Sequence, residues 1–155
     1  MKNTENIEIL KRHYGFLIND FDFSIKEIKS YNYALYVKFV SKDVGIYFIY
    51  EFRDIVPQVQ FTKLNGGTLE PRVGLYTIQK FYIDKDFKLQ SFFLDEILSF
   101  KEHLDYQSYF KSVKTIEDAI MISSTLIDKY AKDFIKGNEL SYKEIDKWYR
   151  AEVSE

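Results

Sequence analysis

Residues 33–63 read YALYVKFVSKDVGIYFIYEFRDIVPQVQFTK, and this stretch decides the fold. Two rows of side chains with different chemistry alternate along it with a period of two, which is typical of strands that bury one face. Ser41-Lys42-Asp43 interrupts the alternation and predicts a turn between two antiparallel strands. The predicted inward row consists of Leu35, Val37, Phe39, Ile46, Phe48 and Tyr50.

The register of this hairpin follows from arithmetic, because the residue numbers of antiparallel partners across a turn have a constant sum. With Lys42-Asp43 at the tip, the sum is 42 + 43 = 85. Val37 then faces Phe48 on the inward side, and Tyr36 faces Ile49 on the outward side. A slip of one residue would mix the two rows, so the pattern specifies the register strongly.

Segments on both sides of the hairpin extend the predicted sheet. Alternation predicts one strand near 21–26, joined to the hairpin by a turn at 30–32, and another strand over 56–63. Pro57 cannot donate a hydrogen bond to a ladder, so it indicates a sheet edge or a strand entrance. Glycine and proline in residues 64–72 predict the junction between the sheet and the following layer.

Helical spacing of apolar residues and capping residues predict most of the remaining chain. Glycine accepts the left-handed backbone that ends many helices, and serine or threonine caps their first turns. Residues 74–90 fit either a short helix or a strand. The predicted helix starts are Asn3 or Thr4, Ser91, Thr115 and Ser141, and the predicted helix ends include Gly15 and Gly137.

These elements predict an α+β fold in a single domain covering residues 1–155. An antiparallel meander of about four strands follows an N-terminal helix and packs against C-terminal helices. We expect the sheet layer at about 16–63 and the helical layer at about 74–152. No apolar run has the length of a signal peptide or of a membrane span, and the cysteine-free sequence fits a reducing cytoplasm. We therefore expect a cytoplasmic protein that is not inserted in a membrane.

No group of residues specifies a reaction. His13 and His103 are far apart in sequence, and there is no cysteine or serine in a nucleophile motif for either to activate. Asp84 and Asp86 lack the remaining ligands of a calcium loop, and Asn65-Gly66-Gly67 lacks the ending of a phosphate-binding loop. We therefore expect no cofactor and no metal, and we favour a non-enzymatic protein.

The outward face of the sheet is the predicted contact surface, because tyrosine mixed with polar groups is typical of protein interfaces. The alternative is that the C-terminal helices fold over this face and bury it. Nucleic acid is a disfavoured partner, since the ribonucleoprotein-type motifs are missing and acidic groups share the face. The predicted partner-binding residues are Tyr36, Lys38, Tyr47, Glu51, Arg53, Gln58 and Gln60.

Residues 127–138 read IDKYAKDFIKGN and resemble a helix ending of small bacterial α+β proteins, in which Tyr-Ala precedes an apolar residue, a basic residue, Gly and Asp or Asn. Tyr14-Gly15-Phe16 in the first helix and the order of helix, strands and helices are also similar. Some proteins of this kind are thought to be immunity proteins of polymorphic toxins. The resemblance implies a bacterial protein whose partner is a cognate toxin.

Two other functions stay open. One is a small-ligand-binding protein or an enzyme with a pocket between sheet and helices, where Glu51, Arg53 and His103 would be the first polar groups to consider. Arg53 has a plain structural alternative, which is an ion pair with Glu51 or Asp54 at the sheet end. The other function is self-association into a homo-oligomer through the exposed sheet edge and the aromatic face.

Overall fold

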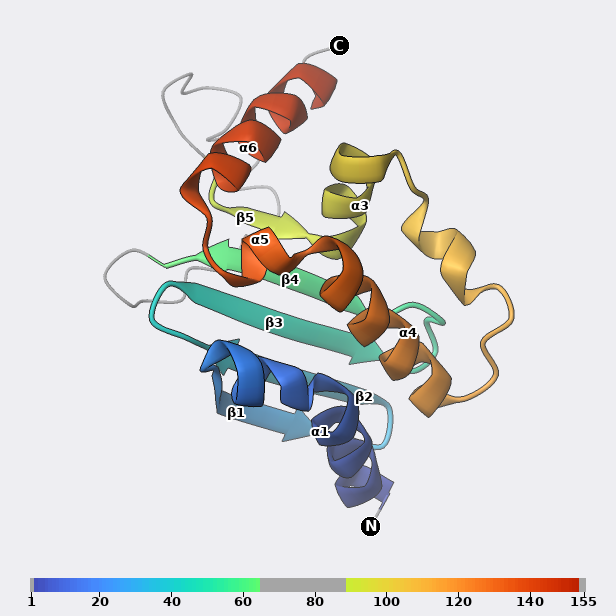
Figure 1. Cartoon of the computed structure of the whole chain (residues 1–155). Helices are drawn as coiled ribbons and strands as arrows, with labels where there is room; N and C mark the ends of the chain where they lie inside the picture. Colours follow the sequence, from blue (N-terminus) through green and yellow to red (C-terminus); the bar gives the residue numbers. More distant parts are fainter. Residues whose placement is uncertain (1, 65–88, 154–155) are drawn as a thin grey trace.

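A computed structural model of the chain describes residues 2–64 and 89–153. Helices lie across one face of an antiparallel sheet (Figure 1), whose described strands follow the order β1-β2-β3-β4-β5. The strands are β1 (Ser24–Ser30), β2 (Ala34–Val40), β3 (Val44–Glu51), β4 (Gln58–Lys63) and β5 (Ser91–Phe93). The helices are α1 (Lys2–Phe21), α3 (Leu94–Glu102), the short 3₁₀ helix η1 (Tyr106–Phe110), α4 (Ile116–Tyr130), α5 (Lys132–Ile135) and α6 (Glu139–Val153).

The predicted α+β class and the meander are confirmed, and the described sheet has one strand more than expected. Ser91 does not open a helix, because residues 91–93 pair with β4 instead. α3 begins at Leu94, and the Glu96 side chain accepts a hydrogen bond of 2.9 Å from the Phe93 amide. The helical layer therefore contains a strand, and the sheet layer begins at Ser24 rather than near residue 16.

The predicted hairpin register between β2 and β3 is confirmed. Val37 lies opposite Phe48 and Tyr36 lies opposite Ile49. Val37 and Phe48 are both fully buried, so the inward row is the core face. Pro57 directly precedes β4, which has neighbours on both sides, so this proline marks a strand entrance rather than an edge.

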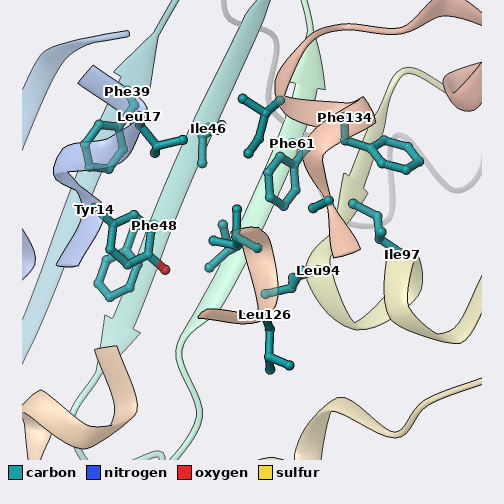
Figure 2. Close-up of a cluster of buried hydrophobic side chains, with 14 of the residues drawn as sticks. Tyr14, Leu17, Phe39, Ile46, Phe48, Phe61, Leu94, Ile97, Leu126 and Phe134 are labelled. Atoms are coloured by element: carbon teal, nitrogen blue, oxygen red, sulfur yellow. The ribbon is translucent and has the colours of Figure 1, made fainter. Parts of the chain in front are cut away.

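The core lies between this inward row and the helices (Figure 2). The Tyr14 ring from α1 stacks on Phe39 at 5.8 Å between ring centroids and meets Phe48 edge-on at 5.3 Å. The Tyr14 hydroxyl also lies 2.6 Å from the Ser123 hydroxyl of α4, so one side chain joins α1, the sheet and α4. Further buried side chains in Figure 2 come from β3, β4, α3, α4 and α5, and they include Ile46, Phe61, Leu94, Ile97, Leu126 and Phe134.

The first helix does not end at Gly15 as predicted but continues to Phe21. Tyr14 and Leu17, on either side of this glycine, are fully buried against the sheet. Their burial outweighs the cost of about 1 kcal/mol that glycine adds inside a helix. The left-handed residue after the helix is Asp22, with φ of 60°, and the Phe23 amide donates to the Leu17 carbonyl at 3.0 Å.

The C-terminal helices follow the predicted caps only in part. Thr115 caps α4 as expected, since its hydroxyl accepts a hydrogen bond of 3.0 Å from the Asp118 amide. The single helix predicted up to Gly137 is interrupted at Ala131, where α4 gives way to the short α5. The last helix begins at Glu139 rather than Ser141, because the Asn138 side chain accepts from the Ser141 amide at 3.0 Å.

Almost all of the predicted junction at 64–72 and of the ambiguous segment at 74–90 lies outside the described residues. In the two described ranges, no helix has the length and hydrophobicity needed to cross a membrane.

Alanine at the two described helix-associated glycines is expected to change stability in opposite directions. Gly137 has φ of 70°, and a Cβ there would lie 3.0 Å from Val44 Cγ2 and 3.2 Å from Asp43 Cβ. Gly137→Ala should therefore lower the free energy of unfolding by about 1–3 kcal/mol. Gly15→Ala is the matched control, because its Cβ would have no neighbour closer than 3.8 Å. This variant should raise the free energy of unfolding by about 0.5–1 kcal/mol.

Urea denaturation followed by circular dichroism measures both changes. Destabilisation by Gly15→Ala, or a neutral Gly137→Ala, would contradict the described course of α1 or of the turn before α6.

Candidate functional site

The outer face of the sheet, opposite the helices, carries most of the predicted partner-binding residues. Side chains from all the described α-helices belong to one core cluster on the inner face. Tyr36, Tyr47 and Ile49 lie outside that cluster and are half-buried. The described C-terminal helices therefore do not seal the outer face, and the alternative in which they fold back over it is not the observed arrangement.

Three tyrosines gather where β1 turns into β2, and we call them the tyrosine cluster: Tyr31, Tyr33 and Tyr36. The Tyr31 and Tyr33 rings are stacked, with centroids 5.3 Å apart and planes 11° apart. Tyr36 meets Tyr31 at 6.2 Å and 69°. Tyr31 is 39% exposed and Tyr33 is 64% exposed, so the cluster presents aromatic surface to solvent.

Lys38 and Tyr47 form the next row of the outer face. Lys38 pairs with Tyr47 across the strands, and its ammonium lies 5.3 Å from the centre of the Tyr47 ring. The same ammonium lies 3.4 Å from a Glu27 carboxylate oxygen of β1. The Lys38 ammonium therefore already has two partners in its own chain, a tyrosine ring and a carboxylate.

Glu51 closes β3 beside the tyrosine cluster. It follows Ile49 by two residues on the same face, and Ile49 is the cross-strand partner of Tyr36. Partial burial, and after it the charge of Glu51 and the neighbouring tyrosines, raise the pKa of the Tyr36 phenol. The Glu51 carboxylate thus acts electrostatically on the Tyr36 phenol.

A cleft of about 560 Å³ opens next to Glu51, between the β3–β4 connection and η1. This volume falls within the range of small-molecule sites. Three of the predicted site residues, Glu51, Arg53 and Gln58, line it. The other residues of the cleft are Ile49, Asp54, Ile55, Val56, Gln107, Phe110 and Lys111.

Arg53 does not form the ion pair that was its structural alternative. Among the described residues, no carboxylate lies within 4.0 Å of its guanidinium, and the same holds for the Lys111 ammonium. Both cations line the cleft, and so do the carboxylates of Glu51 and Asp54. The cleft therefore offers charges of both signs to an incoming group.

Gln60 differs from the sequence prediction, because it is 2% exposed rather than open to a partner. Its neighbour in the outer row of β4, Thr62, is equally buried and bonds to the Ser91 hydroxyl at 2.8 Å. β5, which the sequence did not predict, places Phe93 beside Gln60. Within the described part of the chain the Gln60 amide nitrogen has no hydrogen-bond partner, so Gln60 belongs to the buried part of the sheet.

The polar groups considered for catalysis are not brought together. His103 lines a separate cavity of about 350 Å³ beside Asp105, whereas Glu51 and Arg53 line the cleft. His13 lies 2.9 Å from a Glu117 carboxylate oxygen, which also pairs with Arg12 at 2.7 Å. The hydrogen bond from His13, assisted by Arg12, holds the pKa of Glu117 below its usual value. These contacts of Arg12 and His13 with Glu117 join α1 to α4.

Sequence reasoning missed the exposed rings of Tyr31 and Tyr33, and it missed the wall of the cleft that η1 supplies. The two tyrosines fall in a turn, where a period-two pattern carries no information. A Tyr-Asn-Tyr sequence between two strands was the available signal, because turns rarely need two aromatic residues. In the described ranges, no three histidine or acidic side chains are arranged to hold a metal ion.

The outer face therefore consists of a tyrosine cluster, a cation held internally on Tyr47, and a cleft that begins at Glu51. Comparisons of the chain with protein-family models, with curated proteins and with solved structures find no match.

Proposed function

We propose that the chain is a non-enzymatic protein that binds another protein through the outer face of its sheet. The observation that carries the proposal is the exposed, stacked pair of Tyr31 and Tyr33 next to Tyr36. Tyrosine is enriched at the energetic centres of interfaces because it buries a large area and keeps a polar end. Here three such rings lie together, and the described α-helices lie on the opposite face of the sheet (Figure 1).

The tyrosine cluster and the cleft form one surface. Ile49 pairs with Tyr36 on one side and with Gln58 on the other, and it also lines the cleft. A partner that rests on the tyrosines would therefore also reach Arg53 and Glu51. The proposed contact residues are Tyr31, Tyr33, Tyr36, Tyr47, Lys38, Glu51, Arg53 and Gln58.

The resemblance to small bacterial proteins narrows the proposal to an immunity or antitoxin-like factor that binds a toxin in the bacterial cytoplasm. The cysteine-free sequence fits that reducing compartment. Self-association is the less favoured form of protein binding. The edge strand β1 carries the exposed Lys26 and Lys29 and a bulge near Glu27, and such features oppose pairing with a second copy.

Tyr36→Ala and Tyr33→Ala are expected to weaken partner binding by about thirtyfold each if both rings are energetic centres of about 2 kcal/mol. The tagged chain and its variants are used to capture proteins from lysate of the source organism, and captured proteins are quantified by mass spectrometry. The partner identified in this way is then titrated against each purified variant.

Tyr109→Ala is the matched control, because Tyr109 is 37% exposed but belongs to η1 rather than to the tyrosine cluster. Tyr109→Ala should leave capture unchanged. Each variant should also keep the circular dichroism spectrum of the folded wild type. A partner that all three variants retain equally would show that the outer face is not its binding site.

The cleft supports a second candidate function, which is the binding of a small ligand. Its volume of about 560 Å³ suits a small compound, and the guanidinium of Arg53, which has no carboxylate within 4.0 Å in the described part of the chain, suits a carboxylate or phosphate group. A small acid that raised the melting temperature of the wild type but not of Arg53→Ala would favour this function over protein binding.

A further inference from the structure

The tyrosine cluster and Glu51 together have the composition of a site for a positively charged side chain. Tyr31 and Tyr33 stack with planes 11° apart, and Tyr36 closes the cluster at 69° to Tyr31. The faces of aromatic rings carry negative potential and attract ammonium and guanidinium groups. Because Tyr33 is 64% exposed, a group from another molecule can reach the cluster.

Glu51 supplies the charge that such a site needs. The strand register places it diagonally across from Tyr36, at the end of β3. Among the described residues, no lysine or arginine nitrogen lies within 4.0 Å of its carboxylate, although Arg53 is two residues away. In residues 2–64 and 89–153, this half-buried carboxylate beside Tyr36 therefore has no counter-ion.

The neighbouring row of the outer face contains an example of a cation that lies against both a tyrosine ring and a carboxylate. There the Lys38 ammonium lies 5.3 Å from the centre of the Tyr47 ring and 3.4 Å from the Glu27 carboxylate. Ring, cation and carboxylate are all present in that row and come from the chain itself. In the row of Tyr36 the nearest cation of β1 is Lys29, the cross-strand partner of Tyr36, but its ammonium lies 3.9 Å from the Glu27 carboxylate. Among the described residues, no ammonium or guanidinium lies within 4.0 Å of the Glu51 carboxylate.

We propose that the partner protein places an arginine side chain against the tyrosine cluster and pairs its guanidinium with Glu51. Arginine fits better than lysine because its planar group stacks on a ring while its nitrogens donate to a carboxylate. Glu51 also lines the cleft, so the segment that carries this arginine continues toward Arg53 and Gln58. This inference rests on the proposed function and names the chemistry of its partner.

The test uses two tripeptides with blocked ends, Gly-Arg-Gly and Gly-citrulline-Gly, titrated into the isotope-labelled protein and followed by amide NMR shifts. Citrulline keeps the shape of arginine but has no charge. The arginine peptide should shift the amides of residues 31–36 and 49–52, and the citrulline peptide should bind about threefold more weakly or not at all. Raised salt should reduce the difference.

Glu51→Gln should weaken binding of the arginine peptide by about threefold, the size expected for one exposed ion pair. Glu144→Gln is the matched control, because Glu144 is an exposed carboxylate on α6. Equal binding of the two peptides, an unchanged affinity in Glu51→Gln, or shifts confined to other residues would each overturn the inference.

These outcomes can be separated from those of the capture experiment. If the peptides bind equally while Tyr36→Ala still loses the captured partner, the face binds a protein without a cation, and only the inference fails. If Tyr36→Ala and Tyr33→Ala retain the partner, the proposed function fails whatever the peptides do.

Discussion

Phe48→Ala is expected to lower the free energy of unfolding by about 3–5 kcal/mol, the cost of removing a fully buried phenylalanine ring. Phe48 has no exposed surface and lies on β3, at the centre of the sheet between β2 and β4. Its ring contacts Tyr14 edge-on at 5.3 Å and Tyr50 at 6.2 Å. Alanine would leave a cavity at the contact between α1 and the sheet.

Urea denaturation followed by circular dichroism and by the fluorescence of Trp148 measures this loss. A domain of this size is expected to have about 5–15 kcal/mol of stability, so the variant should still fold in water. Phe48→Leu keeps most of the buried volume and should cost less than half as much.

Ile49→Ala is the matched control on the opposite face of the same strand. Ile49 is half-buried and lies outside the core cluster, so its truncation should cost less than about 1 kcal/mol. Equal losses in Phe48→Ala and Ile49→Ala would contradict the assignment of a buried inner face and an accessible outer face.

The sequence predicted the central hairpin correctly because two independent constraints agree there. Alternation assigns each side chain to a face, and the polar turn at Lys42-Asp43 fixes the register, so Val37 faces Phe48 as expected. The local capping signal at Thr115 was equally reliable, since its hydrogen bond involves only residues of the same helical turn.

The incorrect predictions share one cause, which is contacts between residues far apart in sequence. β5 is only three residues long, and in it Phe92 pairs with Phe61 of β4. No local sequence pattern predicts such a long-range pairing. Gly15 looks like a helix end, yet Tyr14 and Leu17 keep the helix intact by packing on strands far away in sequence. Gln60 was assigned correctly to the outward row, but its burial depends on what lies next to β4.

The same distinction applies to the candidate site. Tyr36, Lys38 and Tyr47 come from regular strands, where alternation predicts their face. Tyr31 and Tyr33 lie in a turn, and Gln107, Phe110 and Lys111 lie in or next to a short 3₁₀ helix, where no period is long enough to detect. The cleft needs both kinds of residue, so its existence could be learned only from the structure.

Stability is also expected to fall steeply at alkaline pH because three tyrosine hydroxyls are buried in the core. Burial raises the pKa of Tyr14, Tyr106 and Tyr142 above the usual value of about 10, and of these three only Tyr14 has a side-chain hydrogen bond, with Ser123, that opposes the shift. Tyr106 donates a hydrogen bond to the Pro57 carbonyl at 2.6 Å, and Tyr142 donates to the Phe134 carbonyl at 3.0 Å. Both bonds require the neutral phenol.

The direction of the pH effect follows from proton binding. Above pH 10 the unfolded chain loses these three protons while the folded chain keeps them, so the unfolded state binds fewer protons and becomes relatively more stable. The contribution is fully present below about pH 10 and is lost as the pH rises toward the raised pKa values. Each phenol contributes about 1.4 kcal/mol per pH unit, which gives about 4 kcal/mol per unit for the three.

Urea denaturation at a series of pH values above 10 measures the slope, and phenolate absorbance in the near ultraviolet follows ionisation. Tyr142→Phe removes one of these buried phenols and should reduce the slope by about 1.4 kcal/mol per pH unit, whereas Tyr33→Phe, at an exposed ring, should leave it unchanged. Ionisation of the buried phenols should coincide with loss of the far-ultraviolet signal, because the core cannot hold three phenolates without solvent. Complete ionisation of all tyrosines with that signal intact would show that Tyr14, Tyr106 and Tyr142 are accessible to water, and the core described between α1, the sheet and the C-terminal helices would then be wrong.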